Sequence, residues 1–177
     1  RTMYEGDGMY KTIYADPPWM EVGGGKIRRG ADRHYELMKT SEIAKLPVKQ
    51  LVHPDGAHLY LWTTNNFLPQ ALEVMAAWGF EYITTITWLK DKMGLGQYYR
   101  GLTEHCLFGV TKNRLPYRFD GDKRAQGVTG FLEGKRAHSE KPQKMRDMIE
   151  RVSYSPRIEL FARERFDGWD AWGNEVA

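Results

Sequence analysis

The chain has 177 residues, of which 41% are hydrophobic and 13% aromatic. This size and composition are typical of a single folded domain, residues 1–177, and they exclude a disordered chain. No apolar stretch approaches the roughly 20 residues that span a bilayer, so no membrane partner is expected. The first residues lack the apolar segment of a signal peptide, and a net charge of +3 permits a polyanionic partner without requiring one.

Cysteine and histidine content narrows the chemistry further. The single cysteine, Cys106, excludes an internal disulfide and a cysteine-based zinc site, and it fits a reducing cytoplasmic compartment. The five histidines lack metal-motif spacing, so we predict no metal centre. We expect His34, His105 and His138 to have structural roles.

Segments of strand and helix character alternate along the chain. We predict, in order, a strand over Thr12–Ala15, a glycine-rich basic loop over Met20–Arg33, a helix over Ser41–Leu46 capped by Thr40, a turn at residues 54–56 and a strand over Ala57–Trp62. There follow a helix from Pro69 to Trp78, strands over Tyr82–Leu89 and Glu104–Thr111, a basic connection over Asn113–Arg136, a helix over Gln143–Val152 and a final strand over Arg157–Ala162. This alternation predicts an α/β fold with a mainly parallel sheet flanked by helices.

The stretch Asp16-Pro17-Pro18-Trp19 directly follows the first predicted strand. Prolines have no amide hydrogen and fix the backbone, so the strand stops where a carboxylate and a tryptophan emerge. In an open α/β sheet, ligands bind at the carboxyl ends of strands. The Asp16 carboxylate and the Pro17 carbonyl offer two acceptors to the two hydrogens of an aromatic exocyclic amine, and Trp19 is suited to stack on the base. The alternative is a rigid turn with a buried tryptophan.

An ordered series of further motifs resembles the DPPW-type adenine N6-methyltransferases. This family includes the catalytic subunit of the eukaryotic messenger-RNA adenosine methyltransferase and many small bacterial and phage enzymes. The matching segments after Asp16–Trp19 include His34-Tyr35, Leu61-Trp62, Trp78-Gly79-Phe80, Glu104-His105-Cys106-Leu107, His138–Pro142, Ile158–Arg163 and Gly168–Glu175. Each segment alone is a weak signal, whereas their order from about Met9 to Val176 is a strong one.

The resemblance implies a Rossmann-like class I methyltransferase fold that uses S-adenosylmethionine. It assigns catalysis to Asp16, Pro17, Pro18 and Trp19, the cofactor site to Asp16, Lys141, Glu159, Phe161, Arg163, Asn174 and Glu175, and the vicinity of the target base to Tyr35 and Glu104. Residue chemistry agrees in part. Asn174 or Glu175 suits ribose hydroxyls, and Lys141 or Arg163 suits a carboxylate. Taken alone, Phe161 indicates core packing, and Glu159 and Arg163 indicate a solvated pair.

Two basic segments are candidates for binding nucleic-acid phosphates. The first contains Lys26, Arg28 and Arg29, and the second contains Lys112, Arg114, Arg118, Lys123, Arg124, Lys135 and Arg136. A base must leave the stack, or already be single-stranded, to be methylated, and cations beside the pocket would hold its flanking phosphates. We predict that these segments bracket the catalytic motif, and ordinary solvated surface is the alternative.

The chain departs from the family pattern at three places. Glu140 precedes Lys141 where the family often has Arg or His, and Arg165-Phe166 replaces polar residues found in some members. Only 15 residues precede Asp16, so a cofactor-contacting segment that longer members have upstream is expected to be shortened or absent. The pocket for the cofactor adenine is therefore the least defined part of the predicted site.

We predict a methyl transfer from S-adenosylmethionine to the N6 amine of adenine in DNA, with RNA as the second choice. The alternatives are a non-catalytic nucleic-acid-binding or partner subunit, and methylation of a small molecule or a protein amide. Because the cofactor methyl is already activated, the protein has to supply positioning and charge stabilisation. The resemblance also leads us to expect a homodimer or heterodimer inside the cell, associated with the nucleoid in a bacterium or phage.

Overall fold

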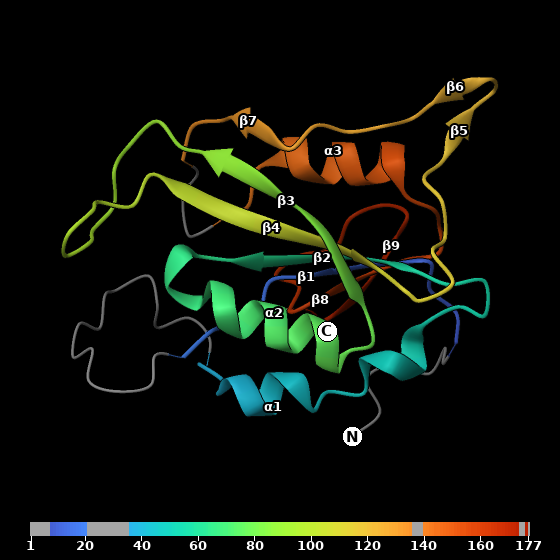
Figure 1. The fold of residues 1–177 in the computed structure, drawn as a ribbon, viewed down its shortest axis with the longest axis horizontal. Helices are drawn as coiled ribbons and strands as arrows, with labels where there is room; N and C mark the ends of the chain where they lie inside the picture. The colour runs from blue at the N-terminus through green and yellow to red at the C-terminus, as the bar shows by residue number, and fades with distance from the viewer. Residues whose placement is uncertain (1–7, 21–35, 136–139, 174–175, 177) are drawn as a thin grey trace.

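The structure, a computed structural model, describes residues 8–20, 36–135, 140–173 and 176. In these residues a seven-stranded sheet has the order β7-β3-β4-β2-β1-β8-β9 (Figure 1). Its strands are β1 (Thr12–Ala15), β2 (His58–Thr63), β3 (Glu81–Leu89), β4 (Thr103–Val110), β7 (Gly130–Leu132), β8 (Arg157–Leu160) and β9 (Trp169–Trp172). A separate hairpin joins β5 (Phe119–Asp120) to β6 (Lys123–Arg124). The predicted α/β class and mainly parallel sheet are confirmed.

Strand β1 lies inside the sheet, between two parallel neighbours. Its Ile13 is opposite Leu59 of β2 and Ile158 of β8. Strand β4 runs antiparallel to both β2 and β3. The start of β4 therefore lies at the same end of the sheet as the last residues of β1, β2 and β8. We call this end the carboxyl end of the sheet.

Helices cover both faces of the sheet (Figure 1). The helices α1 (Thr40–Ala44) and α2 (Leu68–Ala77), with the short 3-10 helices η2 (Val48–Leu51) and η3 (Asn65–Phe67), lie on one side, and α3 (Gln143–Val152) lies on the other. Because successive strand side chains point to opposite faces, Ile13 and Ala15 join the core under α1 and α2. Tyr14 joins a second core with Met145 and Ile149 of α3.

Several predicted boundaries are confirmed, and others are wrong for identifiable reasons. The strand Thr12–Ala15 and the helix Gln143–Val152 have the predicted bounds. Thr40 is the first residue of α1 and not its cap. The cap is Lys39, whose amide N–H donates to the Glu42 carboxylate at 3.3 Å.

The last two strands also correct the sequence prediction. Strand β8 ends at Leu160, two residues before the predicted end, because Phe161 turns the chain with a φ of 61°. A further strand, β9, follows it and pairs in parallel with β8. Arg157–Ala162 is therefore not the final strand.

Only the last part of the basic connection between β4 and α3 lies at the end of the sheet where the catalytic motif stands, so the predicted position is wrong for the rest of the connection. Its first part lies at the opposite end of the sheet, where Arg114 Nη2 contacts Glu81 Oε2 at 3.0 Å. Arg118 donates to the carbonyl oxygen of Glu150 in α3 at 2.7 Å. The connection returns to the carboxyl end through β7, where the Lys135 amide donates to Asp91 Oδ1 at 2.9 Å. Because β4 is antiparallel, a loop that follows it starts at the far end.

Candidate active site

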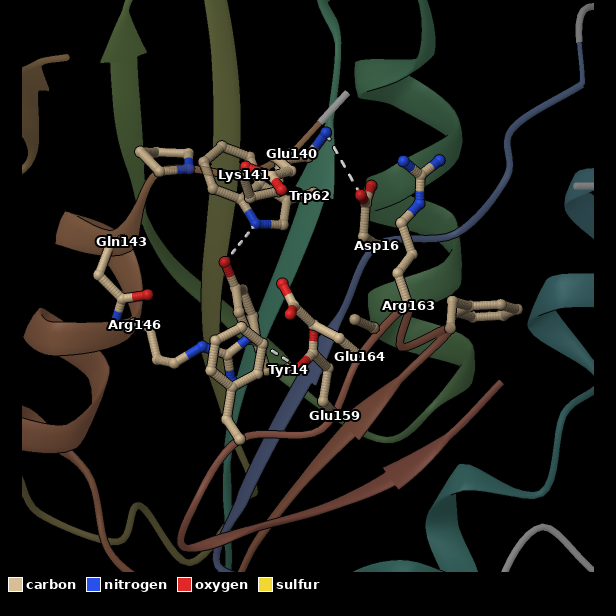
Figure 2. A pocket seen from close by; sticks show the side chains of 14 residues that line it. Tyr14, Asp16, Trp62, Glu140, Lys141, Gln143, Arg146, Glu159, Arg163 and Glu164 are labelled. Carbon is tan, nitrogen blue, oxygen red and sulfur yellow. Dashed lines mark hydrogen bonds and ion pairs between the residues drawn. The ribbon is translucent and has the colours of Figure 1, made fainter. Parts of the chain in front are cut away.

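A pocket opens at the carboxyl end of the sheet, between the end of β1 and the start of α3 (Figure 2). Five of the residues that the sequence assigned to the cofactor line it: Asp16, Lys141, Glu159, Phe161 and Arg163. The fold brings them together because β1 and β8 are adjacent and end at the same level. In the sequence, the first and last of the five are separated by 146 other residues.

Asp16 belongs to a chain of alternating charges that crosses this end of the sheet. Lys141 Nζ lies 3.3 Å from Asp16 Oδ2 and 3.0 Å from Glu104 Oε1. Lys90 Nζ contacts the other oxygen of Glu104 at 2.5 Å. Glu104 reaches the site because it stands near the start of the antiparallel strand β4. The structure thus links Glu104, which the resemblance placed near the target base, to Asp16 through Lys141.

Burial and charge act in opposite directions on the pKa values of these groups. Burial raises the pKa of Asp16, and the nearby Lys141 charge opposes this rise without cancelling it. Burial also acts to raise the pKa of Glu104, but the charges of Lys141 and Lys90 outweigh it, so the pKa is lowered. The two carboxylates outweigh the burial of Lys141 and raise its pKa. Lys141 is therefore a cation at neutral pH, placed between two carboxylates.

The Asp16–Trp19 motif is held rigidly by its own polar atoms. The Trp19 amide donates to the Pro17 carbonyl at 3.0 Å, and its indole Nε1–H donates to the Trp62 carbonyl at 3.0 Å. The Trp19 ring stacks on Phe67 at 6.1 Å with an interplanar angle of 16°. A carbonyl oxygen accepts two hydrogen bonds, so Pro17 retains one acceptor position. Trp19 is half-buried, with one ring face against Phe67.

Glu159 is held by an arginine that the sequence analysis missed. Arg146 Nη2 donates to Glu159 Oε1 at 2.7 Å. Glu159 therefore forms an ion pair with a residue of α3. The guanidinium is 3.6 Å from the centre of the Phe166 ring and 5.4 Å from that of Tyr14. Burial raises the pKa of Glu159 despite this partner. Arg146 lies beside Met145 on the buried face of α3, and a charged residue there was a signal available in the sequence.

The backbone is strained where β8 leaves the sheet beside the pocket. Phe161 has a φ of 61°, a left-handed conformation that costs a side-chain-bearing residue about 1–2 kcal/mol. Such strain concentrates at functional sites. Its ring packs edge-on against Trp172 of β9 at 5.3 Å. Gly173 follows, and a Cβ there would lie 2.6 Å from the Ala162 carbonyl oxygen, so the close approach requires glycine.

Other predicted site residues lie outside the described part of the chain. They are Lys26, Arg28, Arg29, Tyr35, Asn174 and Glu175, together with His34 and His138. His105 is described, and its ring nitrogens contact Thr87 Oγ1 at 2.9 Å and Asn65 Oδ1 at 2.7 Å, which agrees with a structural role. The described residues contain no group of three or more His, Cys, Asp or Glu side chains that could hold a metal ion, and none of their helices is long and apolar enough to cross a membrane.

The fold and this pocket are those of a Rossmann-like methyltransferase, and comparison with known proteins gives the family. The MT-A70 family model matches residues 10–175, and the chain belongs to that family. It is 33% identical to the type II methyltransferase M.MunI from Mycoplasma sp, over 94% of this chain and 78% of that protein. It is 29% identical to the human N(6)-adenosine-methyltransferase catalytic subunit METTL3, over 96% of this chain and 28% of that protein.

A plant relative is also matched over only a small part of its own length. The chain is 31% identical to a probable N(6)-adenosine-methyltransferase MT-A70-like protein from Oryza sativa, over 96% of this chain and 23% of that protein. The chain thus spans most of M.MunI but only about a quarter of the two N(6)-adenosine methyltransferases.

Proposed function

We propose that this protein transfers a methyl group from S-adenosylmethionine to the exocyclic N6 amine of adenine in DNA. The observation that carries the proposal is the convergence of Asp16 with Lys141, Glu159, Phe161 and Arg163 on one pocket. DNA is preferred over RNA because the match extends over most of a type II methyltransferase, whereas it covers about a quarter of the relatives named for adenosine. RNA adenosine is the second candidate.

The residues around the pocket fit the chemistry of S-adenosylmethionine. This cofactor supplies a methyl group on a sulfonium cation and also carries a carboxylate and an adenosine. The carboxylates of Asp16 and Glu159 suit a nearby cation, and Lys141 and Arg163 suit a carboxylate. Phe161 offers an aromatic surface. Asn174 and Glu175 directly follow Gly173 in the sequence, and we propose that they bind the ribose.

The motif at the end of β1 would hold the acceptor amine. Asp16 has a carboxylate oxygen and Pro17 has a remaining carbonyl acceptor position, one for each hydrogen of the amine. As the amine nitrogen gains a bond it gains positive charge, and a carboxylate fixed beside it stabilises that charge. Lys141 Nζ, 3.3 Å from Asp16 Oδ2, would orient this carboxylate. The Trp19 ring, which stacks on Phe67, would also stack on the adenine.

A non-catalytic subunit is the competing class of function. Such a subunit would hold nucleic acid or a partner without turnover, and it would need neither Asp16 nor a lysine poised on that carboxylate. Here both are present and in contact. This contact favours catalysis over a purely binding role. It gives no reason to prefer a small molecule or a protein amide as the methyl acceptor.

Label transfer to separate substrate pools tests the proposal. The protein is incubated with methyl-labelled S-adenosylmethionine and unmethylated DNA, RNA or free nucleosides, and each pool is digested and analysed for N6-methyladenine. We expect label in DNA, and about 10²–10³-fold slower labelling with Asp16→Asn. Asp120→Asn, which changes an exposed carboxylate of the β5–β6 hairpin, serves as the matched control. Label in RNA alone would reverse the substrate preference. No label in any pool, with cofactor binding intact, would favour the binding subunit.

A further inference from the structure

The loop between β3 and β4 exposes two adjacent tyrosines almost completely. Tyr98 and Tyr99 are 93% and 91% exposed, and Met93 and Leu95 in the same loop are 57% and 58% exposed. Within the described part of the chain, neither tyrosine makes a hydrogen bond or a ring contact. Aromatic rings usually bury most of their surface. Two consecutive tyrosines with exposed rings therefore form a surface that is available to a ligand.

Hydrogen bonds within the loop fix its backbone. The Gly94 amide donates to the Gly101 carbonyl at 2.6 Å, and the Gly101 amide donates to the Leu95 carbonyl at 3.1 Å. A Cβ at Gly96 would lie 1.8 Å from the Tyr99 carbonyl oxygen, so only glycine fits there. Arg100 Nε donates to the Gly94 carbonyl at 3.2 Å. These contacts close the loop and hold the tyrosines outward.

The loop starts and ends at the proposed active site. Lys90, at its start, and Glu104, just after its end, are both members of the charge chain that reaches Asp16. The Lys90 amide also donates to the Leu102 carbonyl at 2.9 Å, which ties the two ends of the loop together. The loop therefore lies at the carboxyl end of the sheet, the end at which the pocket opens (Figure 1).

The charges of the loop complement a phosphate backbone. Lys92 and Arg100 are both exposed. The single acid of the loop, Asp91, accepts a hydrogen bond from the Lys135 amide at 2.9 Å and so faces the neighbouring chain segment. Aromatic side chains interspersed with cations are the pattern by which proteins bind single strands, because bases stack on the rings and phosphates contact the cations.

We propose that Tyr98 and Tyr99 form a stacking platform for nucleotides that lie beyond the nearest neighbours of the target adenine, with Lys92 and Arg100 beside the phosphates. This inference rests on the proposed nucleic-acid substrate. It adds that the affinity for a single strand depends on the length of that strand. A target base must be extruded or single-stranded to be methylated, and the nucleotides around it then need a surface on which to stack. An aromatic platform at the same end of the sheet as the pocket provides that surface.

The double variant Tyr98→Ala/Tyr99→Ala tests the platform by fluorescence anisotropy. Stacking on one ring contributes about tenfold or more to affinity. We expect the dissociation constant for a labelled 12-nucleotide single strand to rise at least tenfold. The variant Tyr98→Phe/Tyr99→Phe should bind like the wild type, because the rings remain. Tyr82→Ala, which removes a tyrosine that is 48% exposed at the far end of β3, is the matched control and should change nothing.

Two results would overturn the platform. One is unchanged 12-nucleotide binding by the double alanine variant. The other is a wild-type dimer, measured by light scattering, that this variant dissociates, since the loop would then be a protein interface. Methylation of an adenine trinucleotide, too short to reach beyond its nearest neighbours, separates this inference from the proposed function. Methylation of that trinucleotide by the double alanine variant at the wild-type rate, with weak 12-nucleotide binding, supports the platform.

Discussion

The two faces of the sheet are built from different chemistry. The core under α1 and α2 is largely aliphatic, with Leu59 and Val74 fully buried in it. The core under α3 is aromatic, and its polar atoms are paired. There Trp62 Nε1–H donates to the Tyr14 hydroxyl at 2.6 Å, and the Tyr60 hydroxyl contacts Ser153 Oγ at 2.8 Å. The second face also opens into the pocket.

Because of this difference, the side chains on one face of β1 contribute mainly to stability, and those on the other face lie beside the proposed active site. In β1, Ile13 and Ala15 belong to the aliphatic core, whereas Tyr14 between them belongs to the aromatic core; Tyr14 and Ala15, at the end of the strand, both line the pocket. Asp16 then leaves the strand at its end. An apolar face holds the strand in place, while the other face carries Arg146 and Glu159, which form an ion pair with each other. We therefore expect substitutions on the two faces to affect different measurements.

The largest effect on folding should come from the aliphatic face. Leu59→Ala removes a fully buried side chain, and such changes lower the free energy of unfolding by about 2–5 kcal/mol. The activity of the molecules that remain folded should stay close to that of the wild type. Urea denaturation measures the loss. Leu72→Ala, on the exposed side of α2 at 40% exposure, is the control, and an equal loss in both variants would contradict the assignment of this core.

Lys141→Met should affect both folding and activity. It leaves Asp16 and Glu104 facing each other without the cation between them. Breaking a buried pair costs about 3–5 kcal/mol, and partial exposure of these side chains reduces our expectation to about 2 kcal/mol. Activity should fall as well, because the pKa of Asp16 rises further. Urea denaturation and a pH profile of activity measure the two effects.

The double variant Lys141→Met/Glu104→Gln provides the internal check on this interpretation. Removing the second carboxylate relieves the repulsion, so part of the lost stability should return while activity stays low. Lys123→Met, at an exposed position of the β5–β6 hairpin, is the surface control. No recovery of stability in the double variant would show that Lys141 does not act by separating the two carboxylates.

Tyr14→Phe tests the polar pairing of the aromatic face. It leaves the buried Trp62 indole N–H without its acceptor, which should cost about 1–2 kcal/mol of unfolding free energy. Thermal or urea unfolding detects a loss of this size. The matched change Tyr99→Phe removes the hydroxyl of an exposed tyrosine and should cost nothing. If both variants unfold like the wild type, the Tyr14–Trp62 hydrogen bond contributes no stability.

The smallest effect is a pH dependence from His58. Burial lowers its pKa, while its contact with the Leu115 carbonyl opposes this shift only in part. The unfolded chain then binds more protons than the folded chain below pH about 6.5, so stability decreases as the pH falls from about 6.5 towards the lowered value. We expect a loss of about 1 kcal/mol or less between pH 7 and 5.5. His58→Gln should reduce the slope of unfolding free energy against pH, and an unchanged slope would refute this origin.

The sequence was sufficient for the elements with strong local signals. The apolar run of β1 ends at two prolines, and the Met145, Met148, Ile149 and Val152 spacing defines α3, so both were predicted with their observed bounds. The strands β5, β6 and β7 were missed because two or three residues carry no detectable alternation. Strand β9 was missed because Asp170 and Ala171 are residue types that are depleted in strands. The early end of β8 depends on the left-handed Phe161, and nothing in the residue type indicates that conformation.

The candidate site was predicted unevenly for a similar reason. Asp16 and Lys141 were assigned through motifs, and the structure brings them into contact. The link from Glu104 to Lys141 depends on the antiparallel direction of β4, which a single sequence does not reveal. Arg146 was missed because its partner Glu159 lies on β8, and α3 packs beside this strand only in the folded protein.

The position of the transferred methyl group on adenine is the most direct measurement of the central claim, that Asp16 and Pro17 hold the exocyclic amine beside the methyl donor. The methylated DNA is digested, and mass spectrometry with authentic standards distinguishes N6-methyladenine from ring-methylated adenine. We predict N6-methyladenine as the product, formed about 10²–10³-fold more slowly by Asp16→Asn when the cofactor is saturating. Methylation at a ring nitrogen, or wild-type activity of Asp16→Asn, would contradict the claim.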